Sequence, residues 1–90
     1  MMVVRVKELI WDEYNSDHIS KHSVSTIEVE QVCAGRVTAL PSHSNRVSVI
    51  GKTKTGRMLT IVLARKNASI FYPVTARDTS RKERRWIKHG

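Results

Sequence analysis

The spacing of apolar residues changes near residue 35, and this change constrains the fold more than any other feature of the chain. Before it, Asp12 is a suitable N-cap for a helix over residues 13–22. The stretch "STIE", Ser25 to Glu28, matches a capping box and predicts the start of a second helix, which Gly35 is expected to end in the left-handed conformation. Beyond residue 35, short alternating and β-branched runs replace the helical spacing. The chain therefore combines an N-terminal helical part with a larger β part.

Five runs are predicted to form strands. The first covers Val3 to Glu8, ahead of the helices, and four follow them: "RVTAL", "RVSVIG", "RMLTIVLAR" and "SIFYPVTAR". Turn residues at 41–45, a "KTKTG" hairpin turn ending in Gly56, and Asn67 separate the last four runs. Because "RMLTIVLAR" is apolar on both faces, it is expected to be a central strand. Pro73 lacks an amide hydrogen, so its strand is expected to lie at an edge or to contain a bulge.

A second capping box, "SRKE" from Ser80 to Glu83, predicts a short C-terminal helix to about Lys88. The predicted order is β-α-α-β-β-β-β-α, and ninety residues suffice for one domain over residues 1–90. This order predicts an α+β fold, with an antiparallel twisted sheet, two N-terminal helices on one face and a short C-terminal helix. The second, more polar face is expected to carry some of five residues, depending on the register. These are Arg46, Ser48, Lys52, Arg65 and Arg77.

Cysteine content and hydropathy indicate the compartment. Cys33 is the single cysteine, so no intrachain disulfide forms and nothing points to an oxidising environment. Apolar runs such as Leu59 to Ala64 are too short to span a bilayer, and the N-terminal residues lack the apolar segment of a signal peptide. We therefore expect a cytoplasmic protein that does not contact a membrane.

The net charge of +8 is unevenly distributed along the chain. Residues 8–30 hold six acidic residues and one lysine, a local charge of −5, whereas residues 31–90 hold thirteen basic and two acidic residues, a local charge of +11. Four basic residues of the predicted C-terminal helix have the i, i+3, i+4, i+7 spacing of one helix face. They are Arg81, Arg84, Arg85 and Lys88. Since like charges so close together repel, this stripe favours an anionic partner such as nucleic acid; a solvated basic surface is the alternative.

The pair His18 and His22, four residues apart, shares one face of the first predicted helix, a spacing that zinc ligands often have. Zinc requires three or four ligands, and His43, His89 and Cys33 have no suitable spacing. No metal site and no cofactor are therefore predicted. The pair better suits helix packing, with His22 near the helix end, where the helix dipole favours a protonated imidazole.

The chain contains the residue types that RNA cleavage without a metal ion requires. In that reaction the 2′-OH attacks the adjacent phosphate, so a base, an acid and cations around the phosphorane are needed. A histidine suits the proton transfers and arginines suit the phosphate. The candidates are His22, Lys21, Glu83, Arg46, Arg65, Arg77, Arg81 and Arg84. Because any basic protein owns such residues, they do not by themselves show catalysis.

Two segments in order resemble the BrnT-like toxin family of bacterial type II toxin–antitoxin systems. The stretch "WDEYNSDHISKHSVS" is similar to the family signature W-D-x-x-N-x-x-H/K-I-x-K/R-H-G-V-S/T, and "TARDTSRKER" is similar to its segment T/S-A-R-D/K-x-[ST]-x-x-E-R. The positions that agree are Trp11, Asp12, Asn15, His18, Lys21, His22, Val24 and Ser25, then Thr75, Ala76, Arg77, Asp78, Ser80, Glu83 and Arg84. The resemblance runs from about Ile10 to Arg85. Ser23 replaces a usual glycine, and Ile87 replaces a usual tyrosine, with Trp86 one place before it.

The resemblance implies a RelE/ParE-like fold, RNA cleavage that blocks translation, and a cognate antitoxin with a ribbon-helix-helix DNA-binding part, with a heterotetramer as one possible complex. We therefore expect a metal-independent endoribonuclease toxin. His22, helped by Lys21, is the predicted proton-transfer residue, and Arg77 acts on the phosphate. Asp78 and Glu83 are expected to orient the arginines or to cap the last helix. The predicted phosphate-binding residues are Arg46, Arg65, Arg81, Arg84 and Arg85. The alternative is a non-catalytic basic module, a degenerate toxin, that binds an antitoxin or nucleic acid.

Overall fold

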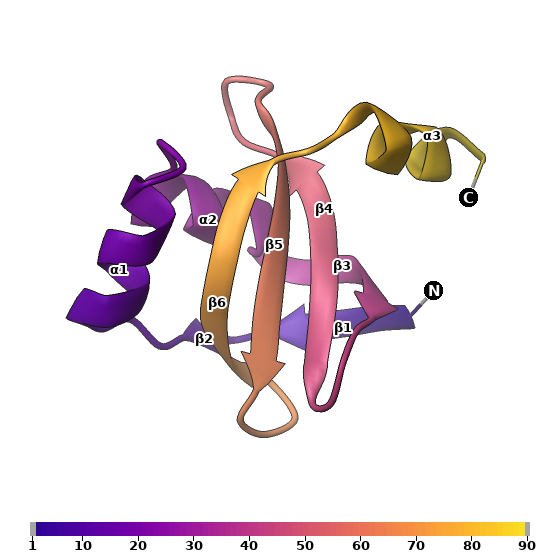
Figure 1. The fold of residues 1–90 in the computed structure, drawn as a ribbon. Coiled ribbons are helices and arrows are strands. Elements are labelled where there is room, and N and C mark those ends of the chain that lie inside the picture. The colour runs from indigo at the N-terminus through magenta and orange to yellow at the C-terminus, as the bar shows by residue number, and fades with distance from the viewer. Residues whose placement is uncertain (1, 90) are drawn as a thin grey trace.

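The computed structural model describes the backbone of residues 2–89 and the side chains of residues 2–85. Over this range the chain forms a curled six-stranded sheet and three helices (Figure 1). The strands are β1 (Met2–Val6), β2 (Glu8–Leu9), β3 (Gly35–Pro41), β4 (Arg46–Lys52), β5 (Met58–Arg65) and β6 (Ile70–Asp78). The helices are α1 (Glu13–Ser20), α2 (Thr26–Val32) and α3 (Arg81–His89). None of these helices has the length and apolar character that crossing a bilayer requires.

Both N-terminal helices begin where the sequence predicts. Asp12 caps α1 and Ser25 caps α2, and each forms the reciprocal pair of hydrogen bonds of a capping box. The first helix is two residues shorter than predicted, because residues 21–23 form a turn in which Ser23 has a positive φ of 59°. Gly35 has the predicted left-handed φ, 69°, but it is already the first residue of β3, two residues beyond the C-cap Cys33.

The prediction of one N-terminal strand in a purely antiparallel sheet is wrong. The segment divides at Lys7: β1 pairs antiparallel with β3, and β2 pairs parallel with β6. The strand order is β1-β3-β4-β5-β6-β2, so two consecutive strands form opposite edges of one sheet. This is possible because the sheet curls: β1 and β3 cross behind the upright strands β4 to β6 in Figure 1. The observed order, with two strands before α1, therefore corrects the predicted β-α-α-β-β-β-β-α.

Strand β5 is interior, as its apolar sequence predicts, and lies between β4 and β6. Pro73 marks a bulge in β6: the register passes from Val62 opposite Thr75 to Leu63 opposite Pro73, which leaves Val74 as an extra residue. The bulge that Pro73 predicts is therefore confirmed.

The helices α1 and α2 cover one face of β4 to β6. Leu59, Ile61 and Leu63 of β5 point to this face and are fully buried, together with Ile19 of α1 and Val29 of α2. The core therefore occupies this covered face. The alternate residues of β4, β5 and β6 point to the other face, which we call the open face because most of them are only partly buried.

Asn15 attaches α1 to the sheet. Its side-chain amide, fully buried, donates to the carbonyls of Ile10 (3.0 Å) and Pro73 (3.1 Å), and its Oδ1 accepts from the Asp12 amide (2.9 Å). A buried carbonyl without a donor would cost roughly 1–3 kcal/mol, so these bonds fix the start of α1 against the bulged part of β6.

Candidate functional site

The end of β6 carries one of the three ion pairs found among the described residues. Arg77 donates from Nη1 to Glu83 Oε1 (2.8 Å) and from Nη2 to Glu83 Oε2 (2.9 Å). This two-pronged contact joins the end of strand β6 to the first turn of α3. Arg77 lies on the open face, opposite Thr60 of β5. Its position there is a consequence of the bulge, since the extra residue reverses which residues of β6 face the core.

Glu83 is held from three further directions. Its Oε1 accepts from the Ser80 amide (2.9 Å) and from the Thr60 hydroxyl (3.1 Å), and the Glu83 amide donates to Ser80 Oγ (3.2 Å). The Ser80 capping box is therefore confirmed. The hydrogen bonds from Arg77, supported by the Ser80 amide, lower the pKa of Glu83 from 4.5 to about 2. At neutral pH the group is a fixed carboxylate.

Arg77 keeps hydrogen-bonding capacity beyond this pair. Its side chain is 46% exposed, and Nη1 also donates to the Asp78 carbonyl (3.2 Å). Within the described residues, the Nε hydrogen and one Nη2 hydrogen have no acceptor. A guanidinium that is fixed on one edge and open on the other can receive a phosphate oxygen without rearrangement.

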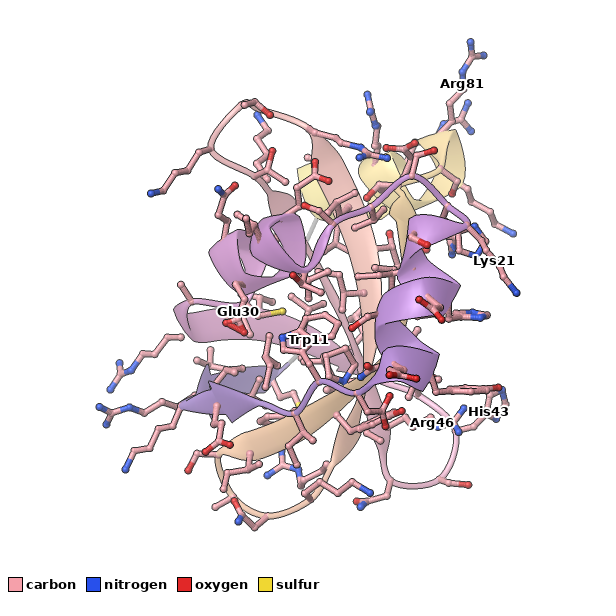
Figure 2. The ribbon with its side chains drawn as sticks, turned by 90° about the vertical axis from the view of Figure 1, so that its left-hand side faces the viewer. Trp11, Lys21, Glu30, His43, Arg46 and Arg81 are labelled. Atoms are coloured by element: carbon pink, nitrogen blue, oxygen red, sulfur yellow. The ribbon has the colours of Figure 1, made fainter. Side chains whose placement is uncertain are left out.

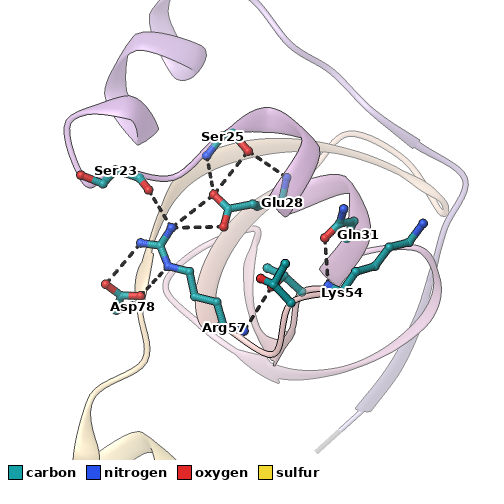
Figure 3. Close-up of polar contacts among 9 residues, drawn as sticks. Ser23, Ser25, Glu28, Gln31, Lys54, Arg57 and Asp78 are labelled. Carbon is teal, nitrogen blue, oxygen red and sulfur yellow. Dashed lines mark hydrogen bonds and ion pairs between the residues drawn. The ribbon is translucent and has the colours of Figure 1, made fainter.

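Asp78, the next residue, points to the covered face and is bound by Arg57. Figure 3 shows Arg57 in contact with Asp78, Glu28 and Ser23 together. Its Nε donates to Asp78 Oδ1 (2.8 Å), and its Nη1 donates to the Ser23 carbonyl (2.7 Å) and to both oxygens of Glu28 (3.2 Å each). We call these four residues the Arg57 cluster.

Within the Arg57 cluster, the pKa of both carboxyl groups, Glu28 and Asp78, is lowered. Arg57 is the main cause of the lowered pKa of Asp78. For Glu28 the pKa is lowered first by the Ser25 amide and then by Arg57. Glu28 thus serves at once as the N3 residue of the α2 capping box and as an ion-pair partner of Arg57.

Lys21 and His22 lie in the exposed turn that follows α1. The rings of His18 and His22 meet edge to face, 5.6 Å between centroids. Neither Lys21 nor His22 makes a side-chain hydrogen bond with Arg77 or Glu83, but Ser23 and Asp78 bind the same guanidinium. The C-terminal end of α1 and the end of β6 accordingly lie at the same end of the sheet (Figure 1).

The predicted arginines of the sheet divide between its faces. Arg46 is exposed and lies opposite Ala64, on the same face as Arg77. The two arginines are separated by four positions along the strands, which at about 3.3 Å per residue is roughly 13 Å. Arg65 points to the covered face instead, with its guanidinium 5.2 Å from the centre of the Phe71 ring.

The basic residues of α3 are exposed where the structure describes their side chains: Arg81, Lys82, Arg84 and Arg85. Lys88, the last member of the predicted stripe, and the substituted positions Trp86 and Ile87 lie outside the described side chains. Figure 2 shows Lys21, Arg46 and Arg81 on the same side of the molecule, its right-hand side in that view, although they come from three different elements. We call these three residues the basic rim of the open face.

Two residues of this site escape sequence reasoning. Arg57 follows a glycine turn, and its partners are 34, 29 and 21 residues away, so no local pattern marks it. Thr60 is a polar residue in the apolar run "RMLTIVLAR", and its hydroxyl contacts Glu83 and Thr79. A polar residue in a central strand is the one available signal, because burial requires it to have a partner.

No group of three or more His, Cys, Asp or Glu side chains suited to a metal ion occurs among the described residues.

Comparisons with known proteins bear on the fold. No protein-family model matches the sequence, and no curated protein matches it. Among solved structures, the chain is similar to the Brucella abortus ribonuclease toxin BrnT, with a TM-score of 0.65 and 18% sequence identity. The similarity covers 82% of this chain and 97% of that one. The two chains thus share their architecture over almost the whole length of BrnT, and the chain has the fold of a BrnT-type ribonuclease toxin.

Proposed function

We propose that the protein is a BrnT-like toxin of a type II toxin–antitoxin system and that it is an endoribonuclease. The observation that carries this proposal is the Arg77–Glu83 pair: a half-exposed guanidinium, fixed by an ionised carboxylate, with two donors left for a phosphate. The pair stands on the open face inside a basic rim. The fold similarity to a ribonuclease toxin supports the same assignment.

The proposed reaction needs no metal ion. The 2′-oxygen of the substrate forms a bond to its own 3′-phosphorus, and the bond from phosphorus to the 5′-oxygen of the next nucleotide breaks. A base accepts the 2′-OH proton and an acid delivers a proton to the departing 5′-oxygen. The products are a 2′,3′-cyclic phosphate and a 5′-hydroxyl end. Cleavage of cellular RNA in the cytoplasm then blocks translation.

His22 is the residue that we assign to proton transfer. It is exposed, it lies in the turn whose Ser23 binds the same guanidinium as Asp78, the neighbour of Arg77, and an imidazole has one nitrogen that can accept a proton and one that can donate it. Lys21, beside it, adds a positive charge for the phosphorane. Glu83 is assigned a positioning role, because a carboxyl group with a pKa of about 2 does not supply a proton at neutral pH.

Phosphate binding is assigned to Arg77 and to the arginines around the open face, namely Arg46, Arg81, Arg84 and Arg85. Arg65, on the other face, is then a ligand only for RNA that passes round the end of β5. Such a basic rim predicts binding that weakens steeply with salt, since each neutralised phosphate releases counterions. An antitoxin with a ribbon-helix-helix part, in a heterotetramer, is the proposed partner that silences the toxin.

The test is cleavage of a labelled single-stranded RNA by the purified protein in excess EDTA. Arg77→Ala and His22→Ala should each lower cleavage by about 100-fold or more, in line with the loss of a phosphate ligand or a proton-transfer group. Arg36→Ala, which removes an exposed arginine of β3, is the matched control and should cleave normally. RNA that binds but stays intact with the wild type would favour the non-catalytic binding module. Normal cleavage by both folded site variants would refute the site.

A further inference from the structure

Arg57 connects three segments that are distant in the sequence: the turn after α1, the start of α2 and the end of β6. It does so from the position just after Gly56, at the turn between β4 and β5 (Figure 3). The turn itself is anchored, because the Thr53 amide and the Arg57 carbonyl bond across it at 2.8 Å and the Arg57 amide donates to the Thr53 hydroxyl (3.2 Å). The guanidinium therefore extends from a fixed base.

The turn after α1 runs between two core residues, Ile19 and Val24, and is itself exposed at Lys21, His22 and Ser23. Its backbone bonds are local, from the His22 amide to the Ile19 carbonyl and from the Ser23 amide to the Ser20 carbonyl. Ser23 adopts a positive φ of 59°, a conformation that costs a residue with a Cβ free energy. Within the described residues, Arg57 is the one side chain that donates to the Ser23 carbonyl. Core packing thus fixes the two ends of the turn, and the contact to Arg57 fixes the exposed backbone at Ser23 between them.

Hydrogen bonds continue from the Arg57 cluster to the catalytic arginine. The Asp78 carboxylate accepts hydrogen bonds from Arg57, and the Asp78 main-chain carbonyl accepts one from Arg77. Arg77 in turn binds Glu83. Displacing Arg57 therefore disturbs two parts of the proposed site together, the turn that carries His22 and the strand end that carries Arg77.

Arg57 itself is poorly placed to bind RNA. Its side chain is 27% exposed, and four of its five N–H groups are engaged: Nε and one of Nη2 with Asp78, and the two of Nη1 with Ser23 and Glu28. Two carboxylates already balance its charge, so a phosphate would have to displace one of them. Its effect on a reaction at the open face acts through the groups that it holds.

We propose that Arg57 is the positioning residue of the candidate site, setting the His22 turn and the end of β6 at a fixed separation. This inference rests on the proposed function, which it deepens. The planar guanidinium is essential to this role, because it directs N–H groups along three edges at once. A lysine at the same position has the charge but cannot hold a carboxylate in two-pronged contact while it reaches a carbonyl on the other side.

The experiment compares Arg57→Lys and Asp78→Asn with the wild type, and uses Arg36→Lys as the matched control on an exposed arginine of β3. Steady-state RNA cleavage gives kcat and KM separately. Amide hydrogen exchange at His22, Ser23 and Val24 reports the attachment of the turn without any reference to activity. Thermal unfolding checks that each variant is folded.

Arg57→Lys should lower kcat about 100-fold, as expected for misplaced reacting groups, while KM changes less than about threefold. Exchange at His22 to Val24 should accelerate about tenfold or more. Asp78→Asn should change kcat and exchange in the same direction by less, and Arg36→Lys should change neither. Wild-type kcat in Arg57→Lys, unchanged exchange at the turn, or a loss confined to KM would each overturn the proposal, the last by making Arg57 an RNA ligand.

Two further outcomes are decisive. Should Arg57→Lys fail to fold, Asp78→Asn decides, and a wild-type kcat in that variant overturns the proposal. Should the wild type cleave no RNA, the proposed function fails, and the exchange measurement alone then judges Arg57. Faster exchange at the turn in both variants would still support its positioning role, and wild-type exchange would refute it.

Discussion

Replacing Glu83 with glutamine tests the contact on which the site depends. The substitution retains the size of the side chain and an oxygen that can accept from Ser80 and Thr60, but removes the charge that binds Arg77. It therefore isolates the ion pair from the packing. Because the pair joins β6 to α3, its loss should appear both in the free energy of unfolding and in its pH dependence.

The magnitude follows from the pKa of Glu83, which is lowered from 4.5 to about 2. At about 1.4 kcal/mol per pH unit, this displacement corresponds to roughly 3 kcal/mol of stabilisation when the carboxylate is ionised. Arg77 is 46% exposed, so solvent screening reduces the figure. We expect Glu83→Gln to lower the free energy of unfolding by about 1–2 kcal/mol at pH 7.

The pH dependence has a definite sign. Since the folded pKa of Glu83 lies below its unfolded value, the stabilisation is complete above the unfolded pKa near 4.5 and disappears as the pH falls through about 2. Urea denaturation of the two proteins, followed by circular dichroism between pH 7 and pH 3, measures the difference. The gap between them should be constant down to about pH 5 and should narrow by roughly half at pH 3. Other acidic groups titrate in both proteins alike and cancel in the difference.

Glu8→Gln is the control, because Glu8 is an exposed carboxylate of β2 without a side-chain hydrogen bond among the described residues. It should change stability by less than about 0.5 kcal/mol at every pH. A gap between wild type and Glu83→Gln that stays constant from pH 7 to pH 3 would show that the charge is not what stabilises this junction. No gap at pH 7 would refute the reasoning altogether.

Three further substitutions test the fold that supports the site. Asn15→Ala leaves two carbonyls without their donor and should cost roughly 2–4 kcal/mol in urea denaturation; a cost below about 1 kcal/mol would contradict its anchoring role. Gly51→Ala places a Cβ 3.0 Å from Val32 Cγ1, so it should destabilise by about 1 kcal/mol, and a double-mutant cycle with Val32→Ala should remove this cost. Ser23→Gly relieves the strain of a positive φ, but it also increases the conformational entropy of the unfolded chain. The net effect should be about 0.5 kcal/mol of added stability and a higher thermal midpoint; a lower midpoint would contradict it.

Local chemistry made the helix starts predictable. The capping boxes at Asp12, Ser25 and Ser80 join residues three positions apart, so the sequence contains both partners of each hydrogen bond. The central place of β5 was predictable for a similar reason, since an unbroken apolar run has to be buried on both faces. These features need no knowledge of distant pairing.

Distant pairing decided what the sequence could not predict. Nothing in residues 2–9 indicates that the chain turns at Lys7 and joins both edges of the sheet, because the partner of β2 lies some sixty residues later. The face occupied by Arg65 depends on register, and a shift of one residue would reverse it. Arg57 was missed for the same reason, since its partners come from three separate segments.

The bulge at Val74 connects the pairing of the strands with the chemistry of the site. It determines which side chains of β6 face the core and which face Glu83 on the open face. Phe71 and Pro73 face the core, so a regular strand would also send residues 75 and 77 to the core and residue 76 to the open face. The extra residue reverses this alternation: Ala76 is fully buried, Arg77 faces Glu83 on the open face, and Asp78 faces Arg57. Without the bulge, Arg77 and Asp78 would exchange faces. The Arg77 cation would then point toward the core, and the Asp78 carboxylate would lie where the phosphate is proposed to bind. A proline that cannot donate to the ladder thus has a direct consequence for the electrostatics of the site.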